Sequence, residues 1–480
     1  MKTIFEKSIR GRRAAKLPKS DVSCSEEIPE KFKRKEGVNL PEVAEIDVVR
    51  HYIHLSKKNF CVDANFYPLG SCTMKYNPKL GEEIARYEGF ANLHPLLPQL
   101  HHGGMLTQGA LEVIYNSERL FCKVTGMDEF SLQPLAGAHG ELTGMLIVAA
   151  YHREKGNKKT KVLIPDSAHG TNPASAAIAG YKVVSIPSDK NGIMDIVEFK
   201  KSLDDEVAAC MLTSPNTLGI FNPYVKEISE LIHRIDGLMY YDGANLNALL
   251  GKCLPGDLGF DIVHLNLHKT FSTPHGGGGP GGGATGVCEK LRKFLPVSRV
   301  IKREDATYAL DYEYSNSIGY IAPFYGNFLV ILKAYAYILN LGGEGLKRVS
   351  ENAVLNANYL LNKLKKCYEI PHPESCLHEF VISAKKQKQK GVSALDIAKR
   401  LIDFGFHPPT IYFPLIVEEA MMIEPTETES KETLDEFALA MIEIAKEVEE
   451  NPDIIKESPQ GLEISRLDEV KAAKELKLNG

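Results

Sequence analysis

The sequence predicts an α/β fold built on a mostly parallel sheet, followed by a smaller α+β domain at the C-terminus. Between about residues 126 and 300, short and nearly continuous apolar runs alternate with stretches that favour helices. Such strands are typical of parallel sheets that helices cover on both faces. Polar residues follow the ends of several of these runs. Because ligands of open α/β sheets bind outside the carboxyl ends of the strands, this edge is where we expect a site.

Five apolar runs are the expected strands of this sheet. They cover residues 161–164, 182–186, 207–212, 238–241 and 262–265. The segments between them that favour helices include 174–179, 196–203 and 225–235. Each run is short enough for a strand and is separated from the next by a helix-length segment, which favours successive parallel strands.

The rest of the chain divides into three expected parts. Residues 1–75 form an N-terminal arm, because prolines and charges are frequent there and only 42–56 has helical periodicity. Residues 76–330 form the large domain and 331–480 the small one. Further helices are expected at 107–125, 324–341, 344–366, 393–404 and 430–449, the last three around a short apolar run at 380–382.

Composition excludes several classes of protein. The 480 residues are 44% hydrophobic and 25% charged, as in ordinary globular proteins. The formal net charge of −5 gives no reason to expect nucleic acid as a partner. The sequence contains no run of about 18 apolar residues, so no membrane span is expected. The start of the chain lacks the apolar core of a signal peptide, so secretion is not expected. Nine scattered cysteines without a C-x-x-C pair favour reduced thiols and a cytoplasmic location.

Lys269 is the most informative residue, because it stands just after an apolar strand and before the glycine-rich run at 276–283. Lysine is almost never fully buried without a partner. Burial disfavours the charged form of a lysine, as the amine of a Schiff base requires. Glycines let backbone approach a ligand closely. A lysine in this setting predicts pyridoxal 5′-phosphate (PLP) as the cofactor and Lys269 as the catalytic residue that holds it.

Other strand ends supply candidates for the cofactor ring. Asp242 ends the run at 238–241, where its carboxylate can pair with the pyridine nitrogen, and the methyl of Ala244 can contact one ring face. His169, which follows another strand, can stack on the opposite face. Taken alone, Asp242 would more often be a turn or helix-cap residue, and His169 could be a plain loop histidine.

The phosphate of PLP needs hydrogen-bond donors. Gly137 and Ala138 precede an apolar helix, whose first N–H groups form a natural anion site. Small residues there also serve ordinary packing, so this signal is moderate. Further expected cofactor contacts come from side chains at other strand ends and beside the lysine: Thr213, Asn216, His268 and Thr270.

Two other motifs are weaker. The glycine-rich run contains G-x-G-x-x-G, but no long helix follows it directly, which argues against a dinucleotide site. His101 and His102 invite a metal reading, yet no acidic or cysteine ligand stands at the usual spacing, so no metal is expected.

Five segments together resemble glycine dehydrogenase (decarboxylating), the P-protein of the glycine cleavage system. They are Pro68–Lys75, Ala136–Glu141, Asp166–Pro173, Asp242–Asn245 and Leu265–Phe271. The resemblance spans nearly the whole chain and matches the C-terminal half of fused P-proteins, which is subunit 2 in split versions. It implies fold type I of the PLP-dependent transferases (the aspartate aminotransferase-like fold) and places the PLP lysine at Lys269.

The resemblance also implies the reaction and its partners. PLP-dependent decarboxylation of glycine is followed by transfer of the aminomethyl group to the lipoyl disulfide of H-protein. A homologous subunit 1 is implied, with two copies of each subunit expected. No arginine of the C-terminal part stands out as a ligand for the glycine carboxylate, so the loop around Ser71, Cys72 and Thr73, or the partner subunit, is expected to hold it. Cys72 could equally be a small packing residue.

Two other functions remain open from the residues alone. An aminotransferase or another amino-acid decarboxylase would share Asp242 and Lys269. A catalytically inactive scaffold subunit would have no need of Lys269, Asp242 and His169 together, which argues against that alternative.

Overall fold

In the computed structural model, the chain forms two compact units, residues 1–64 and 65–480. The structure describes the whole chain except residues 1, 15, 17, 22–27, 95, 98–103, 277, 278, 280, 373–375 and 477–480. The first unit contains helix α1 (Glu45–Ser56). Residues 65–75 fall in the second unit, where they contact strand β12 (Ala420–Ile423). The division of the chain into an arm and two domains stays a prediction.

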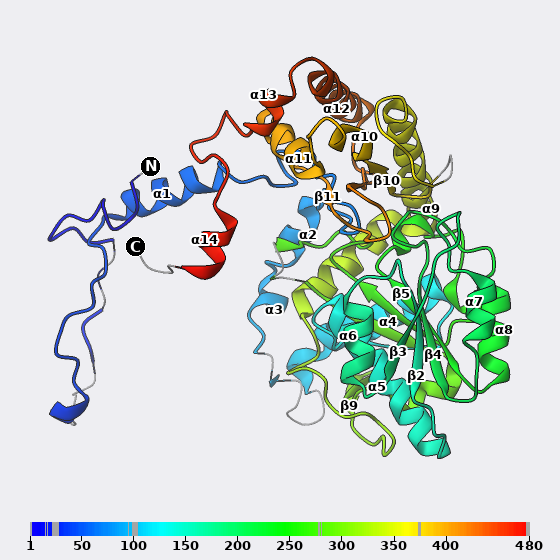
Figure 1. Ribbon diagram of the computed structural model, residues 1–480. Coiled ribbons are helices and arrows are strands. Elements are labelled where there is room, and N and C mark those ends of the chain that lie inside the picture. The colour runs from blue at the N-terminus through cyan, green and yellow to red at the C-terminus, as the bar shows by residue number, and fades with distance from the viewer. Residues whose placement is uncertain are drawn as a thin grey trace. The chain divides into compact units, whose positions relative to one another are not determined.

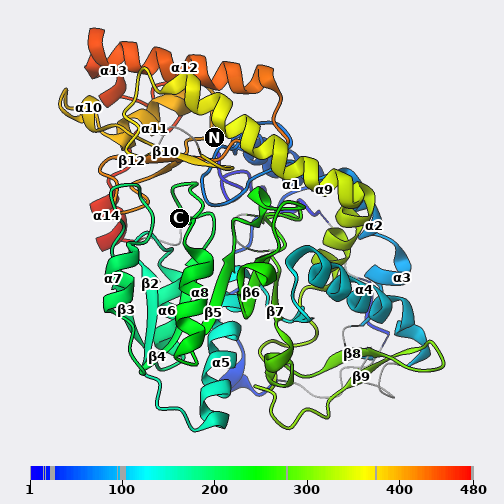
Figure 2. The ribbon, with the colours of Figure 1, turned by 90° about the vertical axis from the view of Figure 1, so that its right-hand side faces the viewer.

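A seven-stranded sheet is the centre of the second unit, with the strand order β1-β7-β6-β5-β4-β2-β3. Its strands are β1 (Glu129–Ser131), β2 (Lys161–Pro165), β3 (Lys182–Ile186), β4 (Val207–Thr213), β5 (Leu238–Gly243), β6 (Ile262–Asn266) and β7 (Gly283–Val287). Strands β2 to β6 pair in parallel, and β7 is antiparallel to both its neighbours. Figure 2 shows most of these strands side by side. The predicted α/β fold with a mostly parallel sheet is confirmed.

Strands β1 and β7 were not expected from the sequence. β1 has only three residues, and β7 contains two glycines, which weaken a strand. The tertiary structure explains one of these two glycines, because a Cβ atom at Gly286 would lie 2.3 Å from the ring of Phe130 on β1. The glycine therefore makes room for an aromatic side chain of the neighbouring strand.

Both faces of the sheet are buried, and successive residues of one strand go to different cores. On β5, Met239 and Tyr241 belong to the core formed with α4 (Gln108–Thr125), α7 (Ile196–Lys201), α8 (Val225–Arg234) and α9 (Phe328–Leu364). Leu238 and Tyr240 belong to the core formed with α5 (Gly137–Lys155) and α6 (Thr171–Ile178). This alternation follows from the two-residue period of a strand and explains why the central strands are apolar throughout.

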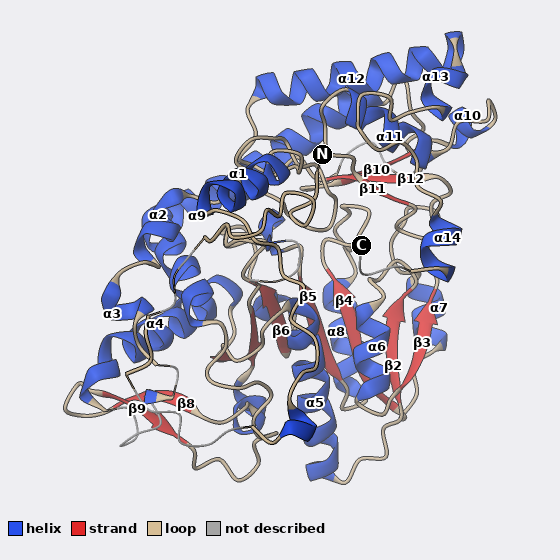
Figure 3. Cartoon of the chain, turned by 90° about the vertical axis from the view of Figure 1, so that its left-hand side faces the viewer, coloured by secondary structure: helices blue, strands red, loops and turns tan. Residues whose placement is uncertain are grey.

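The C-terminal part has its own core around a three-stranded antiparallel sheet with the order β10-β12-β11. It contains β10 (Phe380–Ser383), β11 (Thr410–Ile411), α11 (Ala394–Asp403), α12 (Lys431–Glu450) and α13 (Pro452–Lys456). Figure 3 shows these elements beyond one end of the large sheet. The second half of α9 joins this core. Two helices had been expected where α9 runs, and Gly342, with a φ of 61°, interrupts it between them.

Shorter elements connect these parts. They are α2 (Lys79–Ile84), α3 (Glu88–Ala91), β8 (Arg299–Lys302), β9 (Tyr308–Asp311), α10 (Lys385–Lys388) and α14 (Glu469–Lys474). Figure 1 locates most of them along the chain. Among the residues that the structure describes, no helix combines the length and apolarity needed to cross a membrane.

Candidate active site

The parallel register brings the polar ends of three strands to one edge of the sheet. Thr213 of β4 pairs with Asp242 of β5, and Asp242 pairs with His264 of β6. Lys269 follows β6 by three residues. The site expected at the carboxyl ends of the strands is therefore assembled by strand pairing itself.

Lys269 lies half-buried at this edge, and its Nζ donates a hydrogen bond of 2.6 Å to the carbonyl oxygen of Ser71. Its positive charge affects the pKa values of His169, Asp242 and Glu141, among others. The structure thus brings together the lysine, the acid and the histidine that the sequence singled out, although they are separated by up to 100 positions along the chain.

Asp242 is 2% exposed, and its carboxylate accepts hydrogen bonds from several sides. Oδ2 accepts from Asn172 Nδ2 at 3.1 Å and from Thr213 Oγ1 at 3.3 Å. Oδ1 accepts from the N–H of Ala244 at 2.9 Å. Burial alone would raise the pKa of Asp242, but the His264 ring, the Ala244 N–H and the Lys269 charge outweigh it and lower the pKa. Asp242 is therefore held as a carboxylate.

A buried chain of hydrogen bonds lies behind Asp242. His264 Nε2 lies 3.3 Å from Asp242 Oδ1 and 3.0 Å from Asn266 Oδ1, and His264 Nδ1 lies 2.8 Å from the hydroxyl of Tyr240. Burial lowers the pKa of His264, so the neutral ring is favoured. Because both neighbours of Nε2 are acceptors, we assign the proton to Nε2, and Tyr240 then donates to Nδ1.

Glu141, on the first turns of α5, is a second buried acid at this edge. Its Oε1 accepts a hydrogen bond of 2.9 Å from Thr171 Oγ1. Burial and the adjacent charge of Asp242 raise the pKa of Glu141 to about 8. At neutral pH the pair therefore consists of an ionised Asp242 and a protonated Glu141, as expected when two carboxyls share a dry site.

The two residues expected at the faces of the cofactor ring are Ala244 and His169. The N–H of Ala244 is fixed by Asp242, two residues earlier. The side chain of His169 is exposed, and its ring contacts the edge of Phe413, with 5.7 Å between ring centroids. Desolvation by surrounding atoms and the charge of Lys269 lower the pKa of His169. A neutral imidazole at the open side of the site suits stacking on an aromatic ring.

The start of α5 lies against the end of β6. A Cβ atom at Gly137 would lie 2.1 Å from the amide nitrogen of Asn266, so only glycine fits there. Gly137 and Ala138 occupy the first turn of this 19-residue helix, where N–H groups have no partner within the helix. This end of the helix packs against Asn266, which precedes Lys269 by three positions in the sequence. Its N–H groups and its dipole are what a phosphate requires.

Three further predicted contacts are placed differently. The Asn216 side chain donates a hydrogen bond to the carbonyl oxygen of Gly192 and accepts hydrogen bonds from the N–H groups of Leu218 and Ile220. His268 Nδ1 lies 3.2 Å from the carbonyl oxygen of Gly282 and 3.3 Å from its nitrogen. Thr270 is 1% exposed, and its hydroxyl has no hydrogen-bond partner among the described residues.

These observations show that the residues fit PLP. The site offers a lysine amine, an ionised aspartate, a neutral imidazole, free helix N–H groups and an unpartnered buried hydroxyl at Thr270. The direct contacts of Asn216 and His268 stay predictions, and their observed hydrogen bonds do not favour Asn216. His101 and His102, which invited a metal reading, lie outside the described residues.

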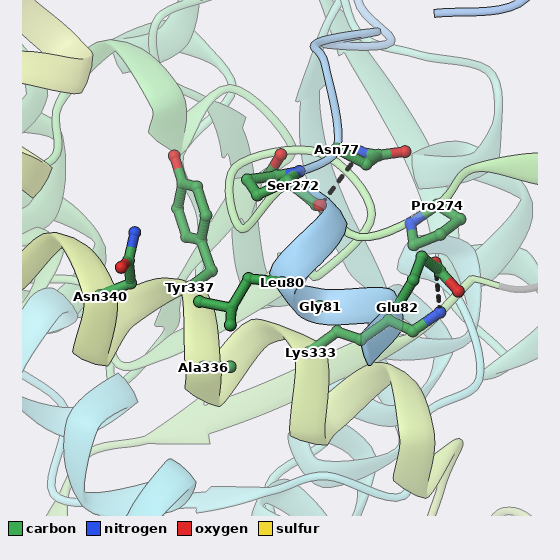
Figure 4. Close-up of a pocket in the computed structure, with 11 residues that line it drawn as sticks. Asn77, Leu80, Gly81, Glu82, Ser272, Pro274, Lys333, Ala336, Tyr337 and Asn340 are labelled. Atoms are coloured by element: carbon green, nitrogen blue, oxygen red, sulfur yellow. Dashed lines mark hydrogen bonds and ion pairs between the residues drawn. The ribbon is translucent and has the colours of Figure 1, made fainter. Parts of the chain in front are cut away.

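Residues 69–77, which we call the lysine-facing loop, contact Lys269 through the carbonyl oxygen of Ser71. Besides the Ser71 carbonyl, the loop binds the segment that follows Lys269: Asn77 Nδ2 donates to the carbonyl oxygen of Ser272 at 3.0 Å, and Ser272 Oγ donates to that of Tyr76 at 2.7 Å. Figure 4 shows Asn77 beside Ser272, with Lys333 of α9 paired to Glu82 nearby.

A buried ion pair secures the end of this loop. Lys75 is 2% exposed, and its Nζ donates to Glu427 Oε1 at 2.7 Å, to Asn247 Oδ1 at 2.8 Å and to the hydroxyl of Tyr337 at 3.1 Å. Burial acts to lower the pKa of Lys75, but Glu427 and Tyr337 outweigh it and raise the pKa. This second buried lysine is fully bonded and therefore structural.

Two arginines of the C-terminal part, Arg400 and Arg466, are paired with acids. Arg400 makes a two-pronged contact with Glu447, at 2.8 and 2.6 Å, and Arg466 pairs with Asp396 at 2.6 Å.

Several site residues were not assigned from the sequence. Glu141 stands within a segment that had been singled out, but its role was missed. Glu379 and Glu424 are 0% exposed and contact the lysine-facing loop. The available signal was that each flanks a short apolar run, β10 or β12. A charged residue beside a buried strand usually faces solvent, so this signal alone would not have found them.

Solved structures share this fold. One is the glycine decarboxylase (P-protein) of the glycine cleavage system in inhibitor-bound form, with a TM-score of 0.72 and 20% identity, covering 87% of this chain and 93% of that chain. A NifS-like protein has a TM-score of 0.61 and 17% identity, covering 80% and 99%. The fold and the lysine site define the class: this is an α/β protein with fold type I of the PLP-dependent enzymes.

Sequence comparison gives the family. The model of the glycine cleavage system P-protein matches residues 20–311, and that of the glycine dehydrogenase C-terminal domain matches 349–460. Relatives named "Probable glycine dehydrogenase (decarboxylating) subunit 2" occur in Caldanaerobacter subterraneus (57% identity, covering 98% of this chain and 97% of the relative) and Listeria welshimeri (54%, covering 99% and 97%). The chain belongs to the glycine dehydrogenase (decarboxylating) subunit 2 family, as its motifs predicted.

Proposed function

We propose that this chain catalyses the PLP-dependent decarboxylation of glycine and transfers the aminomethyl group to the lipoyl disulfide of H-protein. The observation that carries the proposal is the placement of Lys269, half-buried at the strand ends beside the ionised Asp242, in a chain of this family. The names of the relatives supply the substrate, and the geometry supplies a site that can perform the chemistry.

Each residue of the site has a proposed task toward the cofactor. Lys269 would hold it covalently through its amine. Asp242 would keep the pyridine nitrogen protonated, since its carboxylate is stabilised by donors on both oxygens. His169 and Ala244 would contact the two ring faces, and Gly137, Ala138 and Thr270 would bind the phosphate. PLP, when bound, withdraws the electrons left at the substrate carbon as CO2 departs.

The reaction balances without NAD. The bond between the glycine α-carbon and its carboxylate breaks, and that carbon forms a bond to one sulfur of the lipoyl disulfide. The disulfide is reduced by this electron pair, and its second sulfur takes up a proton. What this chain contributes is orientation of the substrate and a site partly shielded from water.

Arg400 and Arg466 of the C-terminal part are paired with Glu447 and Asp396, so neither is proposed as the partner of the glycine carboxylate. We propose that the lysine-facing loop around Cys72, or the partner subunit, holds it. Burial raises the pKa of the Cys72 thiol, which suits a neutral side chain in the pocket. A group that must leave as CO2 gains nothing from a strong ground-state ion pair.

The names of the relatives also imply a second subunit. We propose a homologous subunit 1, with two copies of each chain, and lipoylated H-protein as the accepting substrate.

The test is reconstitution. The purified chain, with and without the homologous subunit, is incubated with PLP, carboxyl-labelled glycine and lipoylated H-protein. We expect a visible absorbance band that borohydride removes, and release of labelled CO2 that depends on H-protein. In Lys269→Ala, turnover should fall by on the order of 10³-fold or more, as for other covalent catalytic residues. Decarboxylation that persists in this variant, or a transamination product from glycine, would overturn the proposal.

A further inference from the structure

A second group of acids lies on the other side of Lys269, in the C-terminal part of the chain. Glu379 precedes β10 and Glu424 follows β12, and both are 0% exposed. With His378 they offer ligand atoms that all lie within 4.8 Å of one another. The described catalytic role of Lys269 uses none of these three residues.

Their hydrogen bonds lead to the lysine-facing loop. Glu379 Oε2 accepts from the backbone N–H of Ser71 at 2.7 Å, and Glu424 Oε2 accepts from that of Thr73 at 2.9 Å. The residue between these two N–H groups is Cys72. Two buried carboxyl groups thus bind alternate N–H groups of one short loop.

The loop needs such support because its backbone is unusual. Ser71 has a φ of 64° and Thr73 a φ of 46°, in the left-handed region that residues with a Cβ rarely adopt. Such conformations persist where the surroundings fix them, and they cluster at functional sites. The loop is also pressed against β12, since a Cβ atom at Gly70 would lie 2.2 Å from the side chain of Met422.

The same loop carries the acceptor of the lysine. Ser71 donates its N–H to Glu379 and offers its carbonyl oxygen to Lys269 Nζ at 2.6 Å. One peptide unit on each side of the Ser71 Cα therefore links the buried acid to the amine. Any rotation of this residue out of its left-handed conformation would carry the carbonyl away from the lysine.

We propose that Glu379 and Glu424 are positioning residues that hold Lys269 in place through the lysine-facing loop. The inference rests on the proposed function, because the placement matters for a lysine that binds PLP. The two acids act through Ser71 and Thr73, and neither needs to touch the substrate.

The two acids differ in how fully they are bonded. Glu379 uses both oxygens, since Oε1 also accepts from Asn245 Nδ2 at 3.1 Å. Glu424 Oε1 has no hydrogen-bond partner among the described residues, although His378 Nε2 lies 3.9 Å away. A glutamine can therefore replace Glu424 with its oxygen toward Thr73 and its amide in the unpaired position. A glutamine at 379 keeps only one of two acceptors.

Both acids also have raised pKa values. Burial and mutual repulsion raise the pKa of Glu379, and burial raises that of Glu424 to about 7. His378 has a pKa lowered to about 3 by burial and is neutral, while Lys269 is a cation that acts on both acids. Glu427, also close to Glu424, is itself paired with Lys75.

The test compares four variants with the wild-type chain: Glu379→Leu, Glu379→Gln, Glu424→Gln and, as the matched control, Glu118→Leu. Glu118 is a buried glutamate of α4 whose charged neighbours are Arg119, Glu129 and Arg299, away from the loop. Circular dichroism and thermal unfolding establish that each variant folds. The first readout is amide hydrogen exchange of the peptide that covers residues 68–76, measured without cofactor.

We expect Glu379→Leu to speed exchange at Ser71 and Thr73 by on the order of tenfold or more, because protection reports local opening. Glu379→Gln should give an intermediate effect, and Glu424→Gln and Glu118→Leu should match wild type. If Glu379→Leu does not fold, the intermediate effect of Glu379→Gln decides the outcome. Loop exchange that is unchanged in every folded Glu379 variant would overturn the proposal.

The second readout is the rate at which PLP becomes attached to Lys269, trapped with borohydride and located by peptide mass spectrometry. We expect this rate to fall about tenfold in Glu379→Leu, to be partly rescued in Glu379→Gln and to stay unchanged in Glu118→Leu. A loosened loop with an unchanged trapping rate would also overturn the proposal. Neither readout needs glycine or H-protein, so a failure of the proposed reaction would be seen separately.

Discussion

Two buried clusters interact with the charge of Lys269; they have nearly the same composition, but the pKa values of their acids shift in different ways. One joins Asp242 and Glu141 to His264 at the edge of the large sheet, and the other joins Glu379 and Glu424 to His378 in the C-terminal part. In the first, the pKa of Asp242 is lowered and that of Glu141 is raised; in the second, the pKa values of both acids are raised. Burial is similar in both, so burial does not explain the difference.

The neighbouring groups explain the difference: the His264 ring, the N–H of Ala244 and the charge of Lys269 lower the pKa of Asp242, whereas Glu424 adds to burial in raising the pKa of Glu379. Asp242 receives bonds from Asn172, Thr213 and Ala244, and His264 behind it is bonded through both ring nitrogens. In the second cluster, the nitrogens of His378 and one oxygen of Glu424 have no hydrogen-bond partner among the described residues. A buried carboxyl is held as an anion when the hydrogen bonds and positive charges around it outweigh burial and the repulsion of a neighbouring acid.

The largest effect is expected for Asp242→Asn, which removes the ionised acid of the first cluster. The amide keeps the shape but removes the negative charge that the donors stabilise, so the pyridine nitrogen loses its anionic partner. We expect kcat for glycine decarboxylation to fall by about 10²- to 10³-fold, in the range for loss of a positioned acid or base. Steady-state kinetics with the reconstituted enzyme measure this, and a loss smaller than about threefold would contradict the role of Asp242.

The next effect concerns stability and pH at the second cluster. Glu424 has a native pKa of about 7, above its unfolded value of 4.5, so the native state binds more protons in this interval. Its contribution to the unfolding free energy therefore falls as pH rises from about 4.5 to 7. The glutamine of Glu424→Gln cannot titrate. The unfolding free energy of this variant, relative to that of wild type, should therefore rise by on the order of 2 kcal/mol from pH 5 to pH 8.

Urea unfolding of wild type and Glu424→Gln at pH 5 and pH 8 measures this difference. Asp242 has the opposite effect on the pH dependence of stability, because its pKa is lowered in the native state. Its contribution to the unfolding free energy is present above about pH 3.8 and is lost as the pH falls through the native pKa. Parallel pH curves for wild type and Glu424→Gln would show that Glu424 titrates normally.

A smaller effect is expected behind Asp242. Tyr240→Phe removes the hydroxyl that lies 2.8 Å from His264 Nδ1 and leaves that nitrogen without its donor, as in the second cluster. We expect a loss of about 1–2 kcal/mol in the unfolding free energy, the cost of an unmet buried polar group. Chemical denaturation provides the measurement, and PLP binding that weakens in parallel would connect the chain of bonds to the cofactor.

The smallest effect should come from Glu141→Gln. The pKa of Glu141 is about 8, so at pH 7 the side chain is mostly protonated and resembles an amide. Activity at pH 7 should change by less than about threefold. Above pH 8 the wild type acquires a second negative charge beside Asp242 and the variant does not, so their pH profiles should diverge there. Profiles that coincide up to pH 9.5 would place the ionisation of Glu141 elsewhere.

The sequence by itself determined the fold class, the family and the first cluster in outline. Strand periodicity and polar strand ends located Asp242 and Lys269 because parallel strands necessarily end at one edge. The prediction was weaker where local signals conflict with the fold, as in the glycine-containing strand β7, whose Gly286 serves Phe130 of a strand far away in the chain.

Only the tertiary structure decided which side chains support the lysine and which acids carry a proton. Ser71 meets Glu379 across 308 positions and Thr73 meets Glu424 across 351, so no local pattern could connect them. The charge of a buried acid depends on donors that folding brings from distant segments, and those distances are set by packing rather than by neighbours in the sequence.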